Sequence, residues 1–263
     1  TRACRSLEFC ATLEASLMRR FLLLICFAGL VMDASYRLEA VAEEPITLED
    51  HIRAHVASRE EVRVFRDEMS WAQFDPDVGY ILGNYVPRDG VGGSSTLSTV
   101  QANGARAQFL YREKPCRINT YGNSFTHCHQ VSDGETWQEY LAGHLGEPIR
   151  NFGMGGFGFY QAYRRMLRVE ESELATSHIV LNLWGLDDHY RSIDAWRWLR
   201  ISSWFRQPRH KYMFHANPWV HLRIEPDSGR VVERENLAPT PDALYRLCEK
   251  DYVFTMFKDD IAL

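Results

Sequence analysis

One serine of this sequence is placed for nucleophilic chemistry. Residues 117–121 are predicted to form a short strand, and Gly122-Asn123-Ser124 follow it directly, ahead of a predicted helix. In that position the Ser124 hydroxyl lies at the carboxyl-terminal edge of a sheet, and the backbone N–H of Ser124 faces the same way. An acyl-transfer enzyme needs such a nucleophile, and N–H donors where the tetrahedral oxyanion forms. Because Gly-Asn-Ser is also an ordinary turn sequence, the prediction depends on the neighbouring strand ends.

Two further strand ends add groups of the required kind. The segment 151–156, Asn-Phe-Gly-Met-Gly-Gly, follows the next predicted strand, and Gly156 can offer its N–H to the same oxyanion. The third strand ends at Trp184-Gly185-Leu186-Asp187-Asp188, which brings polar side chains. The carboxyl ends of parallel strands meet at one edge of a sheet. We therefore expect the three segments to form one site around Ser124.

In this order and spacing, the three segments resemble the sequence blocks of the SGNH (GDSL-type) hydrolase family. The family's Gly-Asp-Ser block matches Gly122-Asn123-Ser124, and its glycine block matches 151–156. Its Gly-x-Asn-Asp block matches 185–188. Segments 75–80 and 103–106 are similar to members that have an N-terminal lead-in.

The resemblance implies a three-layer α/β/α flavodoxin-like sandwich and hydrolysis of ester bonds, often of acyl groups on carbohydrates or lipids, without a cofactor. Ser124 would be the nucleophile that forms the acyl-enzyme, and the N–H groups of Ser124 and Gly156 would bind the oxyanion. The family's third oxyanion donor is an Asn side chain, whereas this sequence has Asp187 there. A carboxylate accepts hydrogen bonds but donates none unless it is protonated. Either Asp187 is held neutral, or the site works with two donors, or catalysis is impaired.

The general base of the family is not found at its usual place. The family's last block, Asp-x-x-His, supplies the base and its partner acid, and no such spacing occurs after Ser192. We therefore expect a C-terminally truncated member whose base lies beyond Leu263. His189 is near the predicted site by sequence, but a histidine at a strand end is usually solvated or caps a helix.

Other functions fit the same residues less well. The spacing Gly153-x-Gly155-x-x-Gly158 satisfies a dinucleotide-binding pattern, but the acid expected about 20 residues later, at the end of the next strand, is missing. His127-Cys128-His129 could suggest a metal, yet these side chains would diverge on a helical turn, so we predict no metal site. The main alternative to an ester hydrolase is a secreted ligand-binding member of the same fold.

The elements that must position these groups alternate between strand and helix. Apolar spacing predicts strands at 117–121, 149–152 and 178–184, and helices at 136–145 and about 159–173. This alternation favours an α/β fold with a parallel sheet. The run 178–184 is continuously apolar and is predicted to be a buried strand. Elsewhere we predict a helix within 46–71, irregular chain to Cys116, a hairpin over 221–232 and a helix over 241–258.

The N-terminal region predicts export. Met18-Arg19-Arg20 precedes the apolar run 21–32, and Ala40-Val41-Ala42 has the pattern of a signal cleavage site. We expect upstream residues and a signal peptide in 1–42, a lead-in in 43–115, and an SGNH-hydrolase-like α/β domain, incomplete at its C-terminus, in 116–263. The resemblance itself covers about 74–192.

Composition excludes some partners. The 263 residues carry 30 Lys and Arg against 35 Asp and Glu, a net charge of -5. Such a chain lacks the basic field that nucleic acid binding requires. We expect a small-molecule or carbohydrate ester as the substrate, with no nucleic acid, no cofactor and no stable membrane span after signal cleavage. Cys116, Cys128 and Cys248, which would remain in the mature chain, are predicted to be free, partly buried thiols.

Overall fold

The computed structural model describes residues 46–193 and 219–259, except 55, 69–71, 85, 87 and 89, and it leaves out the side chains of Asp187 and Tyr190. The predicted signal peptide and upstream residues, 1–42, lie outside the described residues. The described elements belong to one compact unit, Leu48–Leu263.

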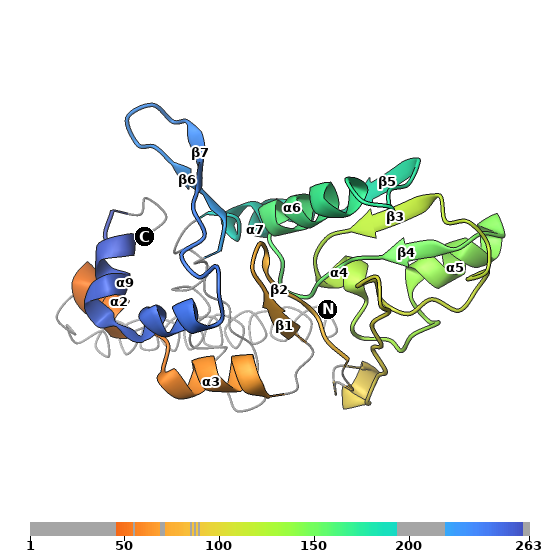
Figure 1. Cartoon of the computed structure of the whole chain (residues 1–263), viewed down its shortest axis with the longest axis horizontal. Coiled ribbons are helices and arrows are strands. Elements are labelled where there is room, and N and C mark those ends of the chain that lie inside the picture. Colours follow the sequence, from red (N-terminus) through yellow and green to blue (C-terminus); the bar gives the residue numbers. More distant parts are fainter. Residues whose placement is uncertain are drawn as a thin grey trace, which may run out of the picture. The chain divides into compact units, whose positions relative to one another are not determined.

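A parallel sheet positions the predicted site. Strand β3 (Ile118–Tyr121) lies between β4 (Ile149–Asn151) and β5 (His178–Leu181), in the order β4-β3-β5 (Figure 1). Ile118 of β3 pairs with Ile149 on one side and with His178 on the other, and both pairings are parallel. The predicted α/β class with a parallel sheet is therefore confirmed, and the three strands end at the same edge.

The connections between these strands are helical, with α4 (Ser124–His127) and α5 (Trp137–Leu145) between β3 and β4, and α6 (Phe159–Glu170) between β4 and β5. Helix α7 (Gly185–Tyr190) follows β5. Helix α5 starts where the Thr136 side chain accepts the Glu139 N–H. It ends at Gly146, which adopts the left-handed conformation with φ of 70° without strain because glycine has no Cβ. Helix α5 contacts β4, and α6 contacts β3 and β5. The helices predicted at 136–145 and 159–173 are both found.

The lead-in contains more regular structure than its sequence predicts. Its elements are α2 (Leu48–Ala54), α3 (Arg59–Asp67), β1 (Ala72–Asp75), β2 (Gly79–Leu82) and a 3-10 turn, η1 (Val91–Gly93). The predicted single helix is two helices because Ser58 starts a new one, with a capping box to Glu61. The hairpin β1-β2 was not predicted. Its turn is held by Asp75 Oδ1, which accepts the N–H groups of Asp77 and Val78 at 3.0 and 2.9 Å.

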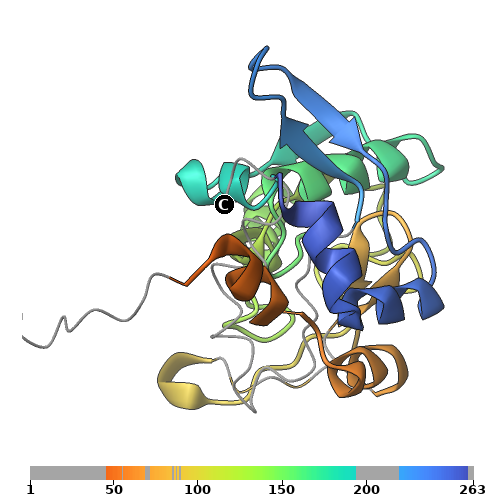
Figure 2. The same ribbon diagram turned by 90° about the vertical axis from the view of Figure 1, so that its left-hand side faces the viewer.

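The C-terminal part packs onto the lead-in. It consists of β6 (His221–Ile224), β7 (Val231–Arg234), η3 (Asp242–Cys248) and α9 (Lys250–Phe257) (Figure 2). The hairpin β6-β7 confirms the prediction, whereas the predicted last helix is divided at Glu249. One core cluster joins Val62 and Tyr80 of the lead-in to Met154 after β4 and to Leu244 of η3.

Strand β5 corrects one prediction. It was expected to be buried, but Ile179 and Val180 are 45% and 41% exposed. Within the described residues β5 pairs only with β3, which makes it an edge strand of the sheet. Length and apolar composition identified the strand correctly, but neither distinguishes a central strand from an edge strand.

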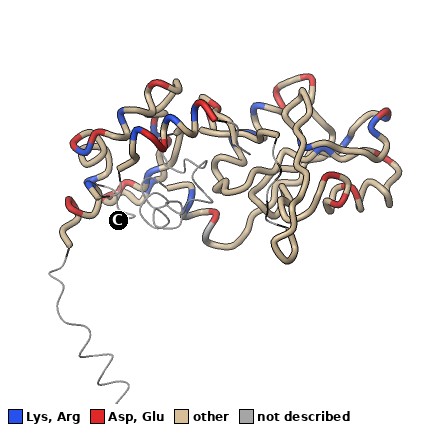
Figure 3. Tube along the Cα trace, turned by 90° about the horizontal axis from the view of Figure 1, so that it is seen from below, with Lys and Arg blue, Asp and Glu red and all other residues tan. Residues whose placement is uncertain are grey.

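The described surface carries mixed charge. Lys and Arg alternate with Asp and Glu along the chain, and no part of the described trace is uniformly basic (Figure 3). Among the described helices, none has the length and apolar character required to cross a membrane. Cys116, Cys128 and Cys248 are free and half-buried.

Candidate functional site

Ser124 is the first residue of α4, directly beyond the carboxyl end of the central strand β3. The tight turn between them depends on Gly122, whose φ is 152° and where a Cβ would lie 2.3 Å from Thr126 Oγ1. Ser124 is half-buried. The strand-turn-helix geometry predicted around this serine is therefore present.

Asn123 connects the turn before Ser124 to α7. Its Oδ1 accepts the Phe125 N–H at 2.9 Å, which caps α4. Its Nδ2 donates to both carboxylate oxygens of Asp188, each at 2.9 Å. The buried Asp188 also accepts the Trp184 N–H at 2.7 Å. The sequence placed Asp188 at this edge but did not reveal that it binds Asn123.

The glycine segment after β4 lies directly against α4. The Met154 N–H donates to Gly122 O at 3.0 Å, and a Cβ on Gly153 would come within 2.3 Å of His127 N. Gly156 follows with a φ of 80° and is half-buried. Within the described residues, neither the Gly156 N–H nor the Ser124 N–H donates a hydrogen bond.

The third predicted oxyanion position is defined only by its backbone. Asp187 lies in α7 close to the end of β5, and its side chain is outside the described residues. Near it, the rings of Phe125 and Trp184 stack with centroids 4.3 Å apart, although 53% and 55% of these residues remain exposed. Phe125 directly follows Ser124, and Trp184 lies three residues before Asp187. The stacked pair therefore forms an exposed apolar surface next to both positions.

No described histidine is hydrogen-bonded to Ser124. His127 is fully buried, and burial, reinforced by the positive charge of Arg106, lowers its pKa well below the usual value. Its Nε2 lies 3.2 Å from Ser98 Oγ. His189 is exposed on α7, with its ring 5.8 Å from that of Phe159. Within the described part of the chain, no side chain is hydrogen-bonded to the Ser124 hydroxyl.

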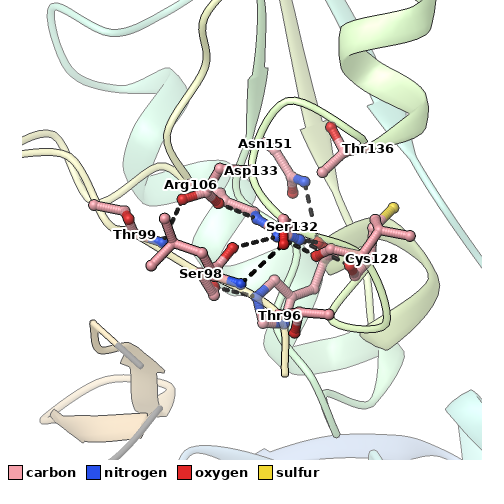
Figure 4. A network of polar contacts seen from close by, with 12 residues as sticks. Thr96, Ser98, Thr99, Arg106, Cys128, Ser132, Asp133, Thr136 and Asn151 are labelled. Atoms are coloured by element: carbon pink, nitrogen blue, oxygen red, sulfur yellow. Dashed lines mark hydrogen bonds and ion pairs between the residues drawn. The ribbon is translucent and has the colours of Figure 1, made fainter. Parts of the chain in front are cut away.

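A buried ion pair lies behind α4, in a network that joins segment 96–106 to the loop 127–133 (Figure 4). Arg106 Nε lies 2.7 Å from Asp133 Oδ1, and the two side chains are 0% and 1% exposed. Asp133 Oδ2 accepts the Thr99 N–H at 2.8 Å, and Thr96 Oγ1 donates to His129 O at 2.9 Å. Sequence reasoning noted Arg106 only as part of a lead-in motif, because its partners lie far along the chain.

Packing accounts for two of the three glycines in the dinucleotide-like pattern, Gly153 and Gly158. Gly153 contacts the backbone of α4, and a Cβ on Gly158 would lie 2.8 Å from Arg191 Cβ. The Gly158 N–H donates to Gln161 Oε1 at 3.2 Å. The described residues also include no group of three potential metal ligands. No protein-family model, curated protein or solved structure matches the chain.

Proposed function

We propose that the protein is a serine ester hydrolase of the SGNH (GDSL-type) kind, in which Ser124 forms an acyl-enzyme. One observation carries this proposal. A half-buried serine starts a helix after the central parallel strand, and its own N–H and that of Gly156 have no partner among the described residues. Nucleophile and oxyanion donors are the parts that acyl transfer requires from the protein.

The topology supports the same class. The order β4-β3-β5 corresponds to the 2-1-3 start of a flavodoxin-like sheet, whose ligand sites lie at the carboxyl ends of the strands. Right-handed crossovers would put α5 and α6 on opposite faces of this sheet. The proposed fold is accordingly a three-layer α/β/α sandwich with an N-terminal lead-in.

The chemistry assigned to this chain is a two-step acyl transfer. Ser124 Oγ attacks the ester carbonyl carbon and loses its proton to a general base, while the carbonyl oxygen becomes an oxyanion. The N–H groups of Ser124 and Gly156 stabilise that charge. The C–O bond to the alcohol then breaks, and the alcohol leaves with the proton. Water attacks the acyl-enzyme in the same way and releases the carboxylic acid.

The proposed substrate is a small-molecule or carbohydrate ester, and the proposed location is outside the cytoplasm. One residue favours a second candidate, a secreted ligand-binding protein of the same fold. Asp187 stands where the family has an Asn donor, and an ionised carboxylate would repel the oxyanion. Two remaining donors have to stabilise the charge alone, and losing one donor typically costs about 10²- to 10³-fold in kcat.

Hydrolysis of p-nitrophenyl acetate by the whole protein, before and after Ser124→Ala, tests the proposal. We expect the variant to lose about 10⁴-fold or more of the catalysed rate. Ser177→Ala is the matched control, because Ser177 is exposed and precedes the amino end of β5, at the opposite end of the sheet from Ser124. Equal rates for the wild type and Ser124→Ala would refute the hydrolase. An inert wild type that still binds ester analogues would support the ligand-binding candidate.

A further inference from the structure

The guanidinium of Arg106 uses all its hydrogen-bonding capacity on backbone and carboxylate around α4. A guanidinium carries five N–H donors. Besides Asp133, four carbonyl oxygens accept from it at 2.6 to 3.1 Å, and they belong to Leu97, His127, Cys128 and Val131. Five donors therefore meet five acceptors in a site from which solvent is excluded.

Two of these carbonyls, those of His127 and Cys128, lie at the C-terminal end of α4, the helix that begins at Ser124. Helix α4 is a single turn, Ser124–His127, and Cys128 closes it in the left-handed conformation, with φ 59°. That conformation is strained for a non-glycine residue, and a single helical turn is not stable alone. The position of Ser124 is consequently set by contacts at both ends of α4, from Asn123 at its start and from Arg106 at its end.

The same arginine also fixes the glycine segment. The backbone N–H of Arg106 donates to Asn151 O at 2.8 Å, in a bridge to the last residue of β4. The side chain of Asn151 accepts the Gly153 N–H at 2.9 Å and donates to His127 O at 3.4 Å. One residue thus contacts both the turn that carries the Ser124 N–H and the strand that leads to Gly156.

We infer that Arg106 is a positioning residue for the oxyanion site. Its guanidinium holds the end of α4 and its backbone N–H holds Asn151, so that the N–H groups of Ser124 and Gly156 keep their relative positions. This inference rests on the proposed function. Lysine cannot replace Arg106, because an ammonium group has three donors at one point and cannot span five acceptors. A displacement of about 1 Å in a catalytic group can cost about 10²-fold in rate.

Arg106→Lys tests the inference, with Arg165→Lys as the matched control. Arg165 is just as buried, yet it binds Gly104 O at 2.8 Å and contacts neither α4 nor Asn151 through any described hydrogen bond. The readouts are Tm, near-ultraviolet circular dichroism, and kcat and KM for p-nitrophenyl acetate at a temperature where each variant is folded. Both variants should have a lower Tm than the wild type. Only Arg106→Lys should have a lower kcat, by about 10- to 100-fold, and its KM should stay within about threefold of the wild-type value.

Several outcomes would overturn the inference. A folded Arg106→Lys protein with kcat within twofold of the wild type would do so, and so would equal kcat losses in both variants. Should Arg106→Lys fail to fold, Asp133→Asn preserves the shape of the acceptor and the four carbonyl bonds. A folded Asp133→Asn protein should show a smaller drop in kcat, and wild-type kcat in that variant would also refute the role. A wild type that hydrolyses no ester instead removes the proposed function, and this inference with it.

Discussion

The buried ring of His127 makes stability depend on pH in a way that can be isolated. The ring is fully buried at the end of α4. The positive charge of Arg106 acts on it, and His129 and Arg165 act in the same direction with smaller effects. Burial and these charges lower its pKa in the folded state well below 6.5. The unfolded chain therefore binds a proton that the folded chain excludes, and stability must fall as pH falls below about 6.5.

The size of the effect follows from linkage. Each pH unit below the unfolded pKa costs about 1.4 kcal/mol for one excluded proton. From pH 8 to pH 5, His127 should remove up to about 2 kcal/mol of the free energy of unfolding. Urea denaturation at several pH values measures it, for the wild type and for His127→Gln. The wild type is expected to be the more stable of the two at pH 8, and its advantage should shrink by up to about 2 kcal/mol at pH 5.

His144→Gln is the matched control, because His144 is exposed on α5. Its stability curve should run parallel to that of the wild type at every pH. Parallel curves for His127→Gln would refute the reasoning, since they would mean that the ring is protonated in the folded protein or exchanges with solvent.

Two further substitutions test the packing and the polar contacts around Ser124. Gly153→Ala should destabilise the protein by about 1–3 kcal/mol, because the new Cβ would lie 2.3 Å from the His127 backbone nitrogen. Gly143→Ala on α5 is its control and should be neutral or stabilise by up to about 1 kcal/mol, since its Cβ meets only Leu110 at 3.6 Å; similar urea midpoints for the two would contradict this account. Asp188→Asn turns one acceptor of the Asn123 amide into a donor, and should cost about 1–3 kcal/mol and lower esterase activity. An unchanged unfolding midpoint together with unchanged ester turnover would count against that role for Asp188.

Local patterns predicted the sheet well because its signals are local. The strand before Gly122, the helix that starts after Thr136 and the glycine segment after β4 each depend on residues within a few positions of one another. The same reasoning failed where a local signal was read too broadly. The capping box at Ser58 divides the first predicted helix, and the Asp75 turn makes a hairpin in chain that had been expected to be irregular.

The contacts that fix the candidate site could not be predicted in the same way. Asn123 and Asp188 are 65 positions apart, and Arg106 reaches carbonyls 21 to 25 positions away on one side and 9 on the other. Backbone carbonyls occur at every residue, so no sequence pattern shows which of them an arginine will bind. Only a side chain with no exposure and a full set of acceptors identifies such a partner, and both properties appear only after folding.

These long-range contacts bear on how the site could catalyse without a third oxyanion donor. Two N–H groups stabilise an oxyanion well only if they are already oriented before the charge forms. Otherwise the free energy needed to reorient them offsets the stabilisation of the oxyanion. Asn123, Arg106 and Asn151 together hold both donor segments through buried groups. If Ser124 is the nucleophile, the rigidity of this polar network matters as much to the rate as the identity of the residue at position 187.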